Sequence, residues 1–270
     1  MLRTLVVALV CADGHTLTSA GLARRLWENP PPGAADTLRS HVSHVRGALC
    51  RAAEPGDHLL GQRILVTEKA HTGVSYRLRL SAEHLDAASF ERLIRAGQVA
   101  LRLDQYGQAA GHFRDALELW RGRPLADVAH LPFAHAHIGH LRNLRMTALL
   151  GRIEADIWSG HHREVIGELE DLIIKRPEDG AVPRLLTTSL YLSERVAEAA
   201  FVCQQAIAGL LAHGLNADPM EELQQHVLNR TLPRQRTAGR IAFEAVGEAY
   251  PGAETTVRSV KKRVMSTPGK

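Results

Sequence analysis

The sequence predicts a mainly α protein of two domains, and three observations support this fold class. A chain of 270 residues with 45% hydrophobic content can bury two ordinary cores. Residues 1–80 have the pattern of three short helices and a hairpin, whereas residues 84–232 have a helical pattern throughout. In the helical part, SGHHREVIGELEDLI from Ser159 matches SERVAEAAFVCQQAI from Ser193 at an offset of 34 residues. The chain therefore combines a small mixed domain with a helical repeat domain.

The first helix is predicted over about ten residues, up to the turn at Asp13-Gly14. Its apolar face consists of Leu5, Val6, Leu9 and Val10. The same stretch imitates a signal peptide, with Arg3 before an apolar run and Cys11 placed like a lipid-attachment cysteine. Val10 stands where such a signal needs a small residue, so a core helix is the better interpretation. No other segment approaches the roughly 20 apolar residues of a membrane span.

A second helix is predicted to start at Thr18 or Ser19, because either hydroxyl can cap the first free amides. It stops at Asn29, since the three prolines of 30–32 and Gly33 cannot continue it.

The third helix, over residues 34–49, is the most informative stretch. Its apolar stripe, at spacings of i, i+4, i+7 and i+11, consists of Leu38, Val42, Val45 and Leu49. At 100° per residue, the opposite face consists of Ser40, Ser43, His44 and Gly47, with Arg39 and Arg46 on its flank. This exposed face carries no acidic residue after Asp36.

A hairpin is predicted after the loop EPGDH. The runs ILVTE and VSYRLRL are rich in β-formers and flank KAHTG, in which Gly73 suits a turn. Lys69, His71 and Thr72 are expected at or near its tip.

From residue 86 the helices repeat, and a third, earlier copy, DQYGQAAGHFRDALELW, lies at an offset of about 55 residues. A 34-residue period of paired helices is typical of tetratricopeptide repeats, in which neighbours bury each other's apolar faces. Small residues such as Ala109 and Ala199 sit where close helix packing needs them. The alternative is an irregular helical bundle with chance similarity.

Charge is distributed unevenly along the chain. The formal net charge of +4 divides into +4 for residues 1–80, −5 for 81–233 and +5 for 234–270. Residues 233–270 are expected to be a basic, disordered tail. Cys11, Cys50 and Cys203 are odd in number and have no metal-type spacing, so we expect a reducing, cytoplasmic compartment and no disulfide framework.

Catalytic and metal chemistry find little support. The sequence has no P-loop, dinucleotide-binding glycine pattern or nucleophile elbow, so we expect neither an enzyme nor a cofactor. A histidine cluster invites a metal hypothesis; it consists of His135, His137 and His140, with His130, His161 and His162 not far away in sequence. Only His137 and His140 have a spacing that can share an ion, and no cysteine or carboxylate is expected beside them. A solvated helical face is the better interpretation.

The segments ARRLWENPPPGAADTLRSHVSHVRGAL, LDAASFERLIRAG and LELWRGRPLAD, with the hairpin between the first two, resemble the Streptomyces antibiotic regulatory protein family. The resemblance runs from about residue 5 to 232. It implies a winged helix-turn-helix in residues 1–80, followed in residues 84–232 by a bacterial transcriptional activation domain of tetratricopeptide-like helices. The family's usual N-terminal sheet is lacking here. Part of the apolar face of residues 5–10 and one side of the hairpin are therefore expected to lack their usual cover.

The resemblance also assigns roles to residues. The third helix matches the recognition helix of such winged helices. It implies that Arg39, Ser40 and His44 approach base edges and that Thr37, His41, Ser43 and Arg46 lie close to phosphates. Lys69, His71 and Thr72 match wing residues that contact the backbone or the minor groove. The face deduced from periodicity agrees for Ser40, Ser43 and His44.

The expected function is that of a sequence-specific transcriptional activator, pathway-specific for a secondary-metabolite (antibiotic) gene cluster. By resemblance, its partners are double-stranded DNA with direct repeats, and RNA polymerase with its sigma factor. Because serine and histidine discriminate bases weakly, self-association on repeated half-sites is expected to supply affinity. The alternative is a protein-interaction module, a repeat scaffold whose truncated winged helix has lost specific DNA binding.

Overall fold

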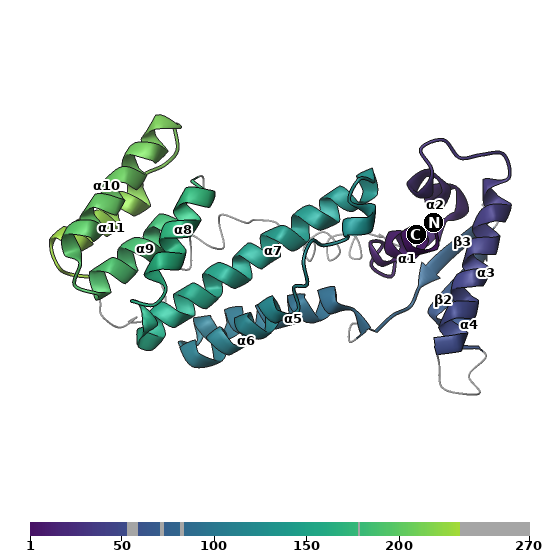
Figure 1. Ribbon diagram of the computed structural model, residues 1–270, viewed down its shortest axis with the longest axis horizontal. Coiled ribbons are helices and arrows are strands. Elements are labelled where there is room, and N and C mark those ends of the chain that lie inside the picture. The colour runs from purple at the N-terminus through teal and green to yellow at the C-terminus, as the bar shows by residue number, and fades with distance from the viewer. Residues whose placement is uncertain (53–58, 71–72, 82–83, 178, 233–270) are drawn as a thin grey trace, which may run out of the picture. The chain divides into compact units, whose positions relative to one another are not determined.

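The computed structural model describes residues 1–52, 59–70, 73–81, 84–177 and 179–232 (Figure 1). It confirms a mainly α protein with a winged helix followed by a helical domain. The loop EPGDH and the basic tail of 233–270 lie outside the described residues. The first elements are α1 Leu2–Val10, β1 Leu17–Thr18, α2 Ser19–Leu26, α3 Ala34–Ala52, α4 Leu60–Ile64, β2 Leu65–Ala70 and β3 Gly73–Leu78. They are followed by α5 Asp86–Arg102, α6 Tyr106–Glu118, η2 Ala126–Val128, α7 Pro132–Asp156, η3 Ile157–His161, α8 Ile166–Lys175, α9 Ala181–Leu192, α10 Val196–Ala212 and α11 Asp218–Leu228.

The chain forms two compact units whose sequence segments alternate. Among the described residues, unit 1 consists of residues 1–91 and 119–144, and unit 2 of residues 92–118 and 145–232. Unit 1 therefore takes a segment from inside the predicted helical domain. The domain boundaries 1–80 and 84–232 stay predictions.

In unit 1, the helices α1, α2 and α3 pack against a small sheet. The Thr18 hydroxyl accepts a hydrogen bond from the Gly21 amide at 3.0 Å, so the predicted cap of α2 is confirmed. The predicted stripe of α3 is buried at Leu38, Val42 and Val45. The sheet has the antiparallel order β1-β3-β2, with Leu17 opposite Tyr76 and Leu65 opposite Leu78. The strand β1 and the helix α4 were not predicted from the sequence.

The expectation of an uncovered first helix is wrong for most of its apolar face. Leu5 and Leu9 are 0% and 1% exposed, because they pack in the core formed with α2, α3 and the hairpin. On another side, Val7 packs against a small cluster of Val128, Ala134 and Ile138. Phe133 packs on the core of the winged helix as well, and Arg3 forms an ion pair with Asp127. Residues 119–144 thus supply cover that the first domain does not supply itself.

Unit 2 contains the repeated helices. In Figure 1, α8, α9, α10 and α11 lie side by side, and their shared core includes Leu169, Leu186 and Cys203. The repeat extends to backbone conformation. Gly160, the second residue of the first copy, has φ +94°, and Glu194, 34 residues later, has φ +66°. Asp104, at the start of the early copy, has φ +56°. In all three copies the turn before the second helix therefore contains a left-handed residue, which ends a helix by redirecting the chain.

Close packing in unit 2 depends on glycine. A Cβ atom built on Gly151 of α7 would lie 2.5 Å from the ring of Phe113, and one on Gly97 of α5 would lie 2.8 Å from it. The Phe113 side chain, which is fully buried, therefore occupies space that only glycine leaves open on two neighbouring helices.

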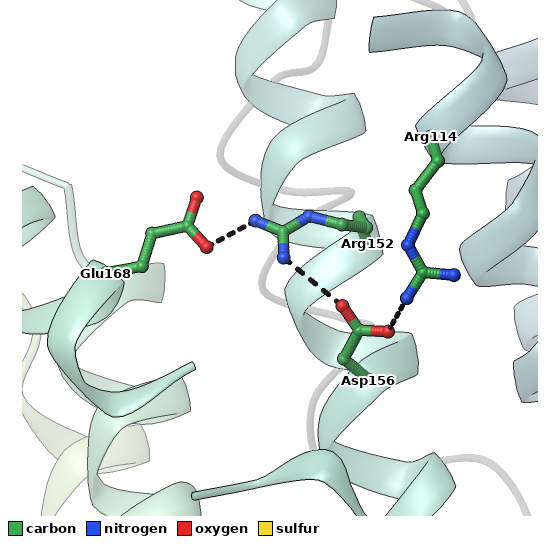
Figure 2. A network of polar contacts seen from close by, with 4 residues as sticks. All are labelled: Arg114, Arg152, Asp156 and Glu168. Atoms are coloured by element: carbon green, nitrogen blue, oxygen red, sulfur yellow. Dashed lines mark hydrogen bonds and ion pairs between the residues drawn. The ribbon is translucent and has the colours of Figure 1, made fainter. Parts of the chain in front are cut away.

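A polar network joins three helices of unit 2 (Figure 2). The Asp156 carboxylate of α7 accepts from Arg114 of α6 and, at 3.2 Å, from Arg152 of α7. Arg152 also donates to Glu168 of α8. The Asp156 side chain is 7% exposed and that of Arg152 is 16% exposed, so each charge is largely removed from water and depends on its partners.

Candidate nucleic-acid interface

The candidate surface is the side of α3 that faces away from the core. Five of the predicted contact residues are exposed on this helix: Thr37, Arg39, Ser40, Ser43 and His44. His41 and Arg46 are half-buried. The pattern of burial agrees with the rotation deduced from periodicity, because the same helix buries Leu38, Val42 and Val45. Their contacts with DNA stay predictions.

Arg39 is held by a neighbour one turn earlier. Its Nη2 atom lies 2.6 Å from Asp36 Oδ1, and both side chains are more than half exposed. Exposed pairs of this kind contribute about 0–1 kcal/mol, so the guanidinium can leave Asp36 for a stronger acceptor at little cost. A guanine edge or a phosphate is such an acceptor, because both offer paired oxygen or nitrogen acceptors to the guanidinium fork.

His41 lies against an aromatic ring from the preceding turn. The centroids of the His41 and Trp27 rings are 6.4 Å apart, and the ring planes differ by 18°. Trp27 immediately follows α2, so the stack joins the two helices of the helix-turn-helix. This contact holds the half-buried His41 ring against the end of α2.

Arg46 makes contacts inside the protein that the sequence did not predict. Its Nε and Nη2 atoms donate to the Leu65 carbonyl oxygen at 2.9 and 2.5 Å, and Nη2 also donates to Thr67 Oγ1 at 2.7 Å. Both acceptors belong to β2, the first strand of the wing. Arg46 therefore connects the recognition helix to the wing. A phosphate contact by Arg46, as predicted, would have to use N–H groups of the guanidinium that do not take part in these bonds.

Glycine allows α4 to approach Arg46 closely. A Cβ atom on Gly61 would lie 2.4 Å from the Arg46 carbonyl oxygen, and the Gly61 amide donates to Cys50 Sγ at 3.3 Å. The helices α3 and α4 can therefore approach this closely only because Gly61 has no side chain. Since α4 leads directly into β2, this approach sets where the wing begins.

Polar contacts connect the wing to the segment between α1 and β1 and to the start of α2. Glu68 of β2 accepts from Thr16 Oγ1 at 3.1 Å, and its other oxygen lies 2.7 Å from Arg77 Nη2 on β3. Ser19, the first residue of α2, donates to the Val74 carbonyl oxygen at 2.9 Å. The one carboxylate of β2 is therefore neutralised by a neighbour rather than presented alone to an anionic partner.

Of the three predicted wing residues, the structure describes one. Lys69 is exposed on β2, opposite Val74. His71 and Thr72 lie outside the described residues. The residues that sequence reasoning missed are Trp27, Gly61, Thr16 and Glu68. Of these, only the cross-strand pair of Glu68 with Arg77 could have been found, from alternating positions of opposite charge in two predicted strands.

The histidine cluster has a different environment from the one expected. Glu91 Oε1 of α5 lies 3.4 Å from His140 Nε2, so the prediction that no carboxylate lies beside these histidines is wrong. The glutamate comes from a helix distant in sequence, which spacing alone did not indicate. Burial lowers the pKa of His137, and the nearby His140 lowers it further, against the opposing effect of Glu91 and Asp13. Within the described part of the chain, no three His, Cys, Asp or Glu side chains are arranged to hold a metal ion.

Cys11, Cys50 and Cys203 form no disulfide in the described part of the chain, and burial raises the pKa of Cys11 and of Cys203. None of the described helices is long and apolar enough to cross a bilayer.

Known proteins resemble the chain over most of its length. The family described as the bacterial transcriptional activator domain matches residues 85–228. The regulatory protein AfsR of Streptomyces coelicolor is 34% identical over 231 residues, which cover 84% of this chain and 22% of AfsR. The regulatory protein DnrI of Streptomyces peucetius is 28% identical over 236 residues, covering 86% of this chain and 84% of DnrI.

The transcriptional regulatory protein EmbR of Mycobacterium tuberculosis is 28% identical over 266 residues, which cover 98% of this chain and 64% of EmbR. The chain thus spans about a fifth of AfsR and a little under two thirds of EmbR. A solved structure of EmbR, in complex with a low-affinity phosphopeptide, matches with a TM-score of 0.76 at 26% identity. That match covers 97% of this chain and 65% of the EmbR chain.

Proposed function

The chain belongs to the Streptomyces antibiotic regulatory protein family, whose bacterial transcriptional activator domain it carries, and we propose on this basis that it is a sequence-specific, DNA-binding transcriptional activator. It acts in the cytoplasm of a bacterium, on the promoters of a secondary-metabolite gene cluster. It binds direct repeats there and recruits RNA polymerase with its sigma factor.

One observation carries the proposal. The helix α3 buries its apolar stripe and exposes polar side chains without an unpaired acid, beside a wing that carries Lys69. An α-helix fits the major groove of B-form DNA, where Arg39 can pair with a guanine and Ser40 or His44 can contact other base edges. The stack on Trp27 and the bonds of Arg46 to β2 support a preformed surface that needs no ordering on binding.

The experiment is a mobility-shift titration on promoter fragments neighbouring the protein's own gene, with and without their direct repeats. We expect specific binding whose affinity falls steeply with salt, by a slope of about −0.9 per phosphate contacted. The variant Arg39→Ala combined with His44→Ala should lose the preference for repeats, by roughly tenfold or more in affinity.

Arg142→Ala is the matched control, because Arg142 is exposed on α7 and distant in sequence from the predicted surface. It should leave binding unchanged. Sequence-specific binding by the double variant, at wild-type affinity, would refute the site. Binding by the wild type that is indifferent to sequence would refute the activator proposal and favour the interaction module.

A separate observation favours a protein partner for the helical domain. Between Ala199 and Ala217 the sequence has no Asp, Glu, Lys or Arg, and Phe201, Leu211 and Leu215 are 56–60% exposed in and just after α10. A solvated helix normally carries charges on its outer face, whereas an exposed apolar stripe is typical of a contact surface. We assign this stripe to RNA polymerase, on the basis of the family.

The stripe is tested by in vitro transcription from a promoter that the protein binds. Phe201→Ser with Leu211→Ser should reduce activation at least severalfold while the mobility shift stays at the wild-type position and affinity. Glu221→Ser, on the exposed side of α11, is the control. Full activation by the double variant would remove the stripe from the proposed polymerase contact.

A further inference from the structure

A pocket opens in unit 1 outside the elements of the predicted DNA surface. It lies between the start of α5, the segment Leu119–Leu125 and α7, and its volume is about 360 Å³. Pockets that bind small molecules range from about 300 to 1,000 Å³, so this one suits a compound of one or two rings. Neither the predicted contacts of α3 nor those of the wing use any residue that lines it.

The walls of the pocket are aromatic and aliphatic. The rings of Phe90 and Trp120 have centroids 5.5 Å apart and planes tilted by 51°. Phe90 and Leu141 are buried, whereas Trp120 is half-buried, and all three line the pocket. Because the two rings are tilted, a planar ligand between them can stack on the face of one ring and contact the edge of the other.

The mouth of the pocket carries more positive than negative charge. Arg121 and Arg123 both line it, against the single carboxylate of Asp86. Asp86 Oδ2 lies 3.3 Å from Arg121 Nη2, and both side chains are more than 70% exposed. Arg123 is exposed and makes no hydrogen bond or ion pair with any residue that the structure describes. A carboxylate that enters the pocket can therefore pair with the guanidinium of Arg123. It can also pair with that of Arg121, which the exposed ion pair with Asp86 holds only weakly.

The loop that carries Arg121 and Arg123 is held in place by packing and by its backbone conformation. Leu125 has φ +50°, an uncommon conformation for a leucine, and its side chain packs against Val128, Ala134 and Ile138. Gly122, between the two arginines, has φ +97°, which glycine adopts without a steric penalty. The packing of Leu125 and the left-handed conformations of Gly122 and Leu125 thus define the path of this loop along the pocket.

We propose that this pocket binds a small planar carboxylic acid of one or two fused rings. The ring lies against Trp120 and Phe90, and the carboxylate pairs with Arg123 and with Arg121. The proposal is independent of the proposed DNA contacts, because it uses other residues.

The probe is 2-naphthoate, titrated into the 270-residue chain by isothermal calorimetry. Its neutral isostere 2-naphthamide has the same ring system without the charge, and 2-naphthylmethylammonium reverses the charge. We expect saturable binding of 2-naphthoate, about tenfold weaker binding of the amide because a charge-assisted pair is lost, and no saturable binding of the ammonium compound.

Three variants locate the binding. Arg123→Gln should weaken 2-naphthoate about tenfold and leave 2-naphthamide unchanged. Ala87→Phe, at a half-buried lining position, should fill the pocket and abolish the binding of both. Arg142→Gln, also an exposed arginine of unit 1, should change neither.

The proposal is overturned by any of three results. These are the absence of saturable binding of 2-naphthoate, equal affinities for the acid and the amide, and wild-type affinity of Arg123→Gln for 2-naphthoate. If Ala87→Phe does not fold, as judged by thermal melting, the comparison of Arg123→Gln with Arg142→Gln decides alone.

Discussion

The Arg46 guanidinium donates two hydrogen bonds to the Leu65 carbonyl oxygen, and so joins the predicted recognition helix to the first residue of the wing strand. Leu65 is fully buried, and its side chain belongs to the same core as Leu38 and Val42 of α3. The arginine thus has a structural role whether or not it also touches DNA.

Arg46→Ala is therefore expected to lower stability as well as DNA affinity. Loss of bonds from a charged donor to a part-buried carbonyl should reduce the free energy of unfolding by about 2 kcal/mol. Arg39→Ala, which removes only an exposed pair, should change it by less than about 0.5 kcal/mol. Urea denaturation of both variants checks this difference. Equal stabilities would mean that Arg46 contributes nothing to the joint between helix and wing.

The left-handed residues of the repeat predict opposite effects for two substitutions. Gly160→Ala forces a side chain into the left-handed region and should cost about 1 kcal/mol of unfolding free energy. Glu194→Gly, 34 residues later, relieves the same strain and should gain up to about 1 kcal/mol, less the chain entropy of glycine. Thermal denaturation measures both.

The control for this pair is Glu222→Gly, in the interior of α11, which should be destabilising by about 1 kcal/mol because no left-handed conformation is relieved there. A destabilising effect of Glu194→Gly as large as that of the control would show that backbone strain at this position is negligible.

The network of Figure 2 predicts a large cost for removing one carboxylate. Asp156→Ala leaves Arg152, whose side chain is 16% exposed, with its ion pair to Glu168 of α8. We expect a loss of about 3 kcal/mol in the free energy of unfolding, because the largely buried Arg152 charge loses one of its two carboxylate partners.

Asp171→Ala is the comparison, since the pair of Asp171 with Lys175 is exposed at 69% and 68%. It should cost no more than about 0.5 kcal/mol. Chemical denaturation of the two variants side by side tests the network, which would have no special energetic role if their losses were alike.

Stability should depend on pH through His137. Burial lowers the pKa of this histidine below its ordinary 6.5 in the folded chain, so the unfolded chain binds more protons. The contribution of His137 to the free energy of unfolding is therefore fully present above pH 6.5. It decreases as the pH falls below 6.5 toward the lower pKa of the folded chain. His162, whose pKa burial also lowers, acts in the same direction.

His137→Gln should reduce the difference in unfolding free energy between pH 7.5 and pH 5.5, without abolishing it. His130→Gln, at an exposed position, should leave the difference as it is in the wild type. An unchanged pH dependence in His137→Gln would exclude this residue as a source of acid sensitivity.

Local features of the fold were predicted from the sequence because they depend on neighbours in the chain. The Thr18 cap, the buried stripe of α3 and the offset of 34 residues between Gly160 and Glu194 are of this kind. The left-handed conformation of Glu194 was not predicted, because glutamate gives no signal for it. The acceptors of Arg46 and the stack of Trp27 on His41 depend on which segments meet in space, which no spacing along the chain reveals.

The alternation of the two units affects how pieces of this protein can be exchanged. A chimaera that transplants residues 1–80 onto another activator leaves behind Phe133, Val128 and the partner of Arg3. It exposes Val7 and part of the core surface to water, so a graft that changes DNA specificity has to bring residues 119–144 with it. In evolution, the same constraint would make this stretch of the activator domain vary together with the DNA-binding head rather than with the repeats that surround it in the sequence.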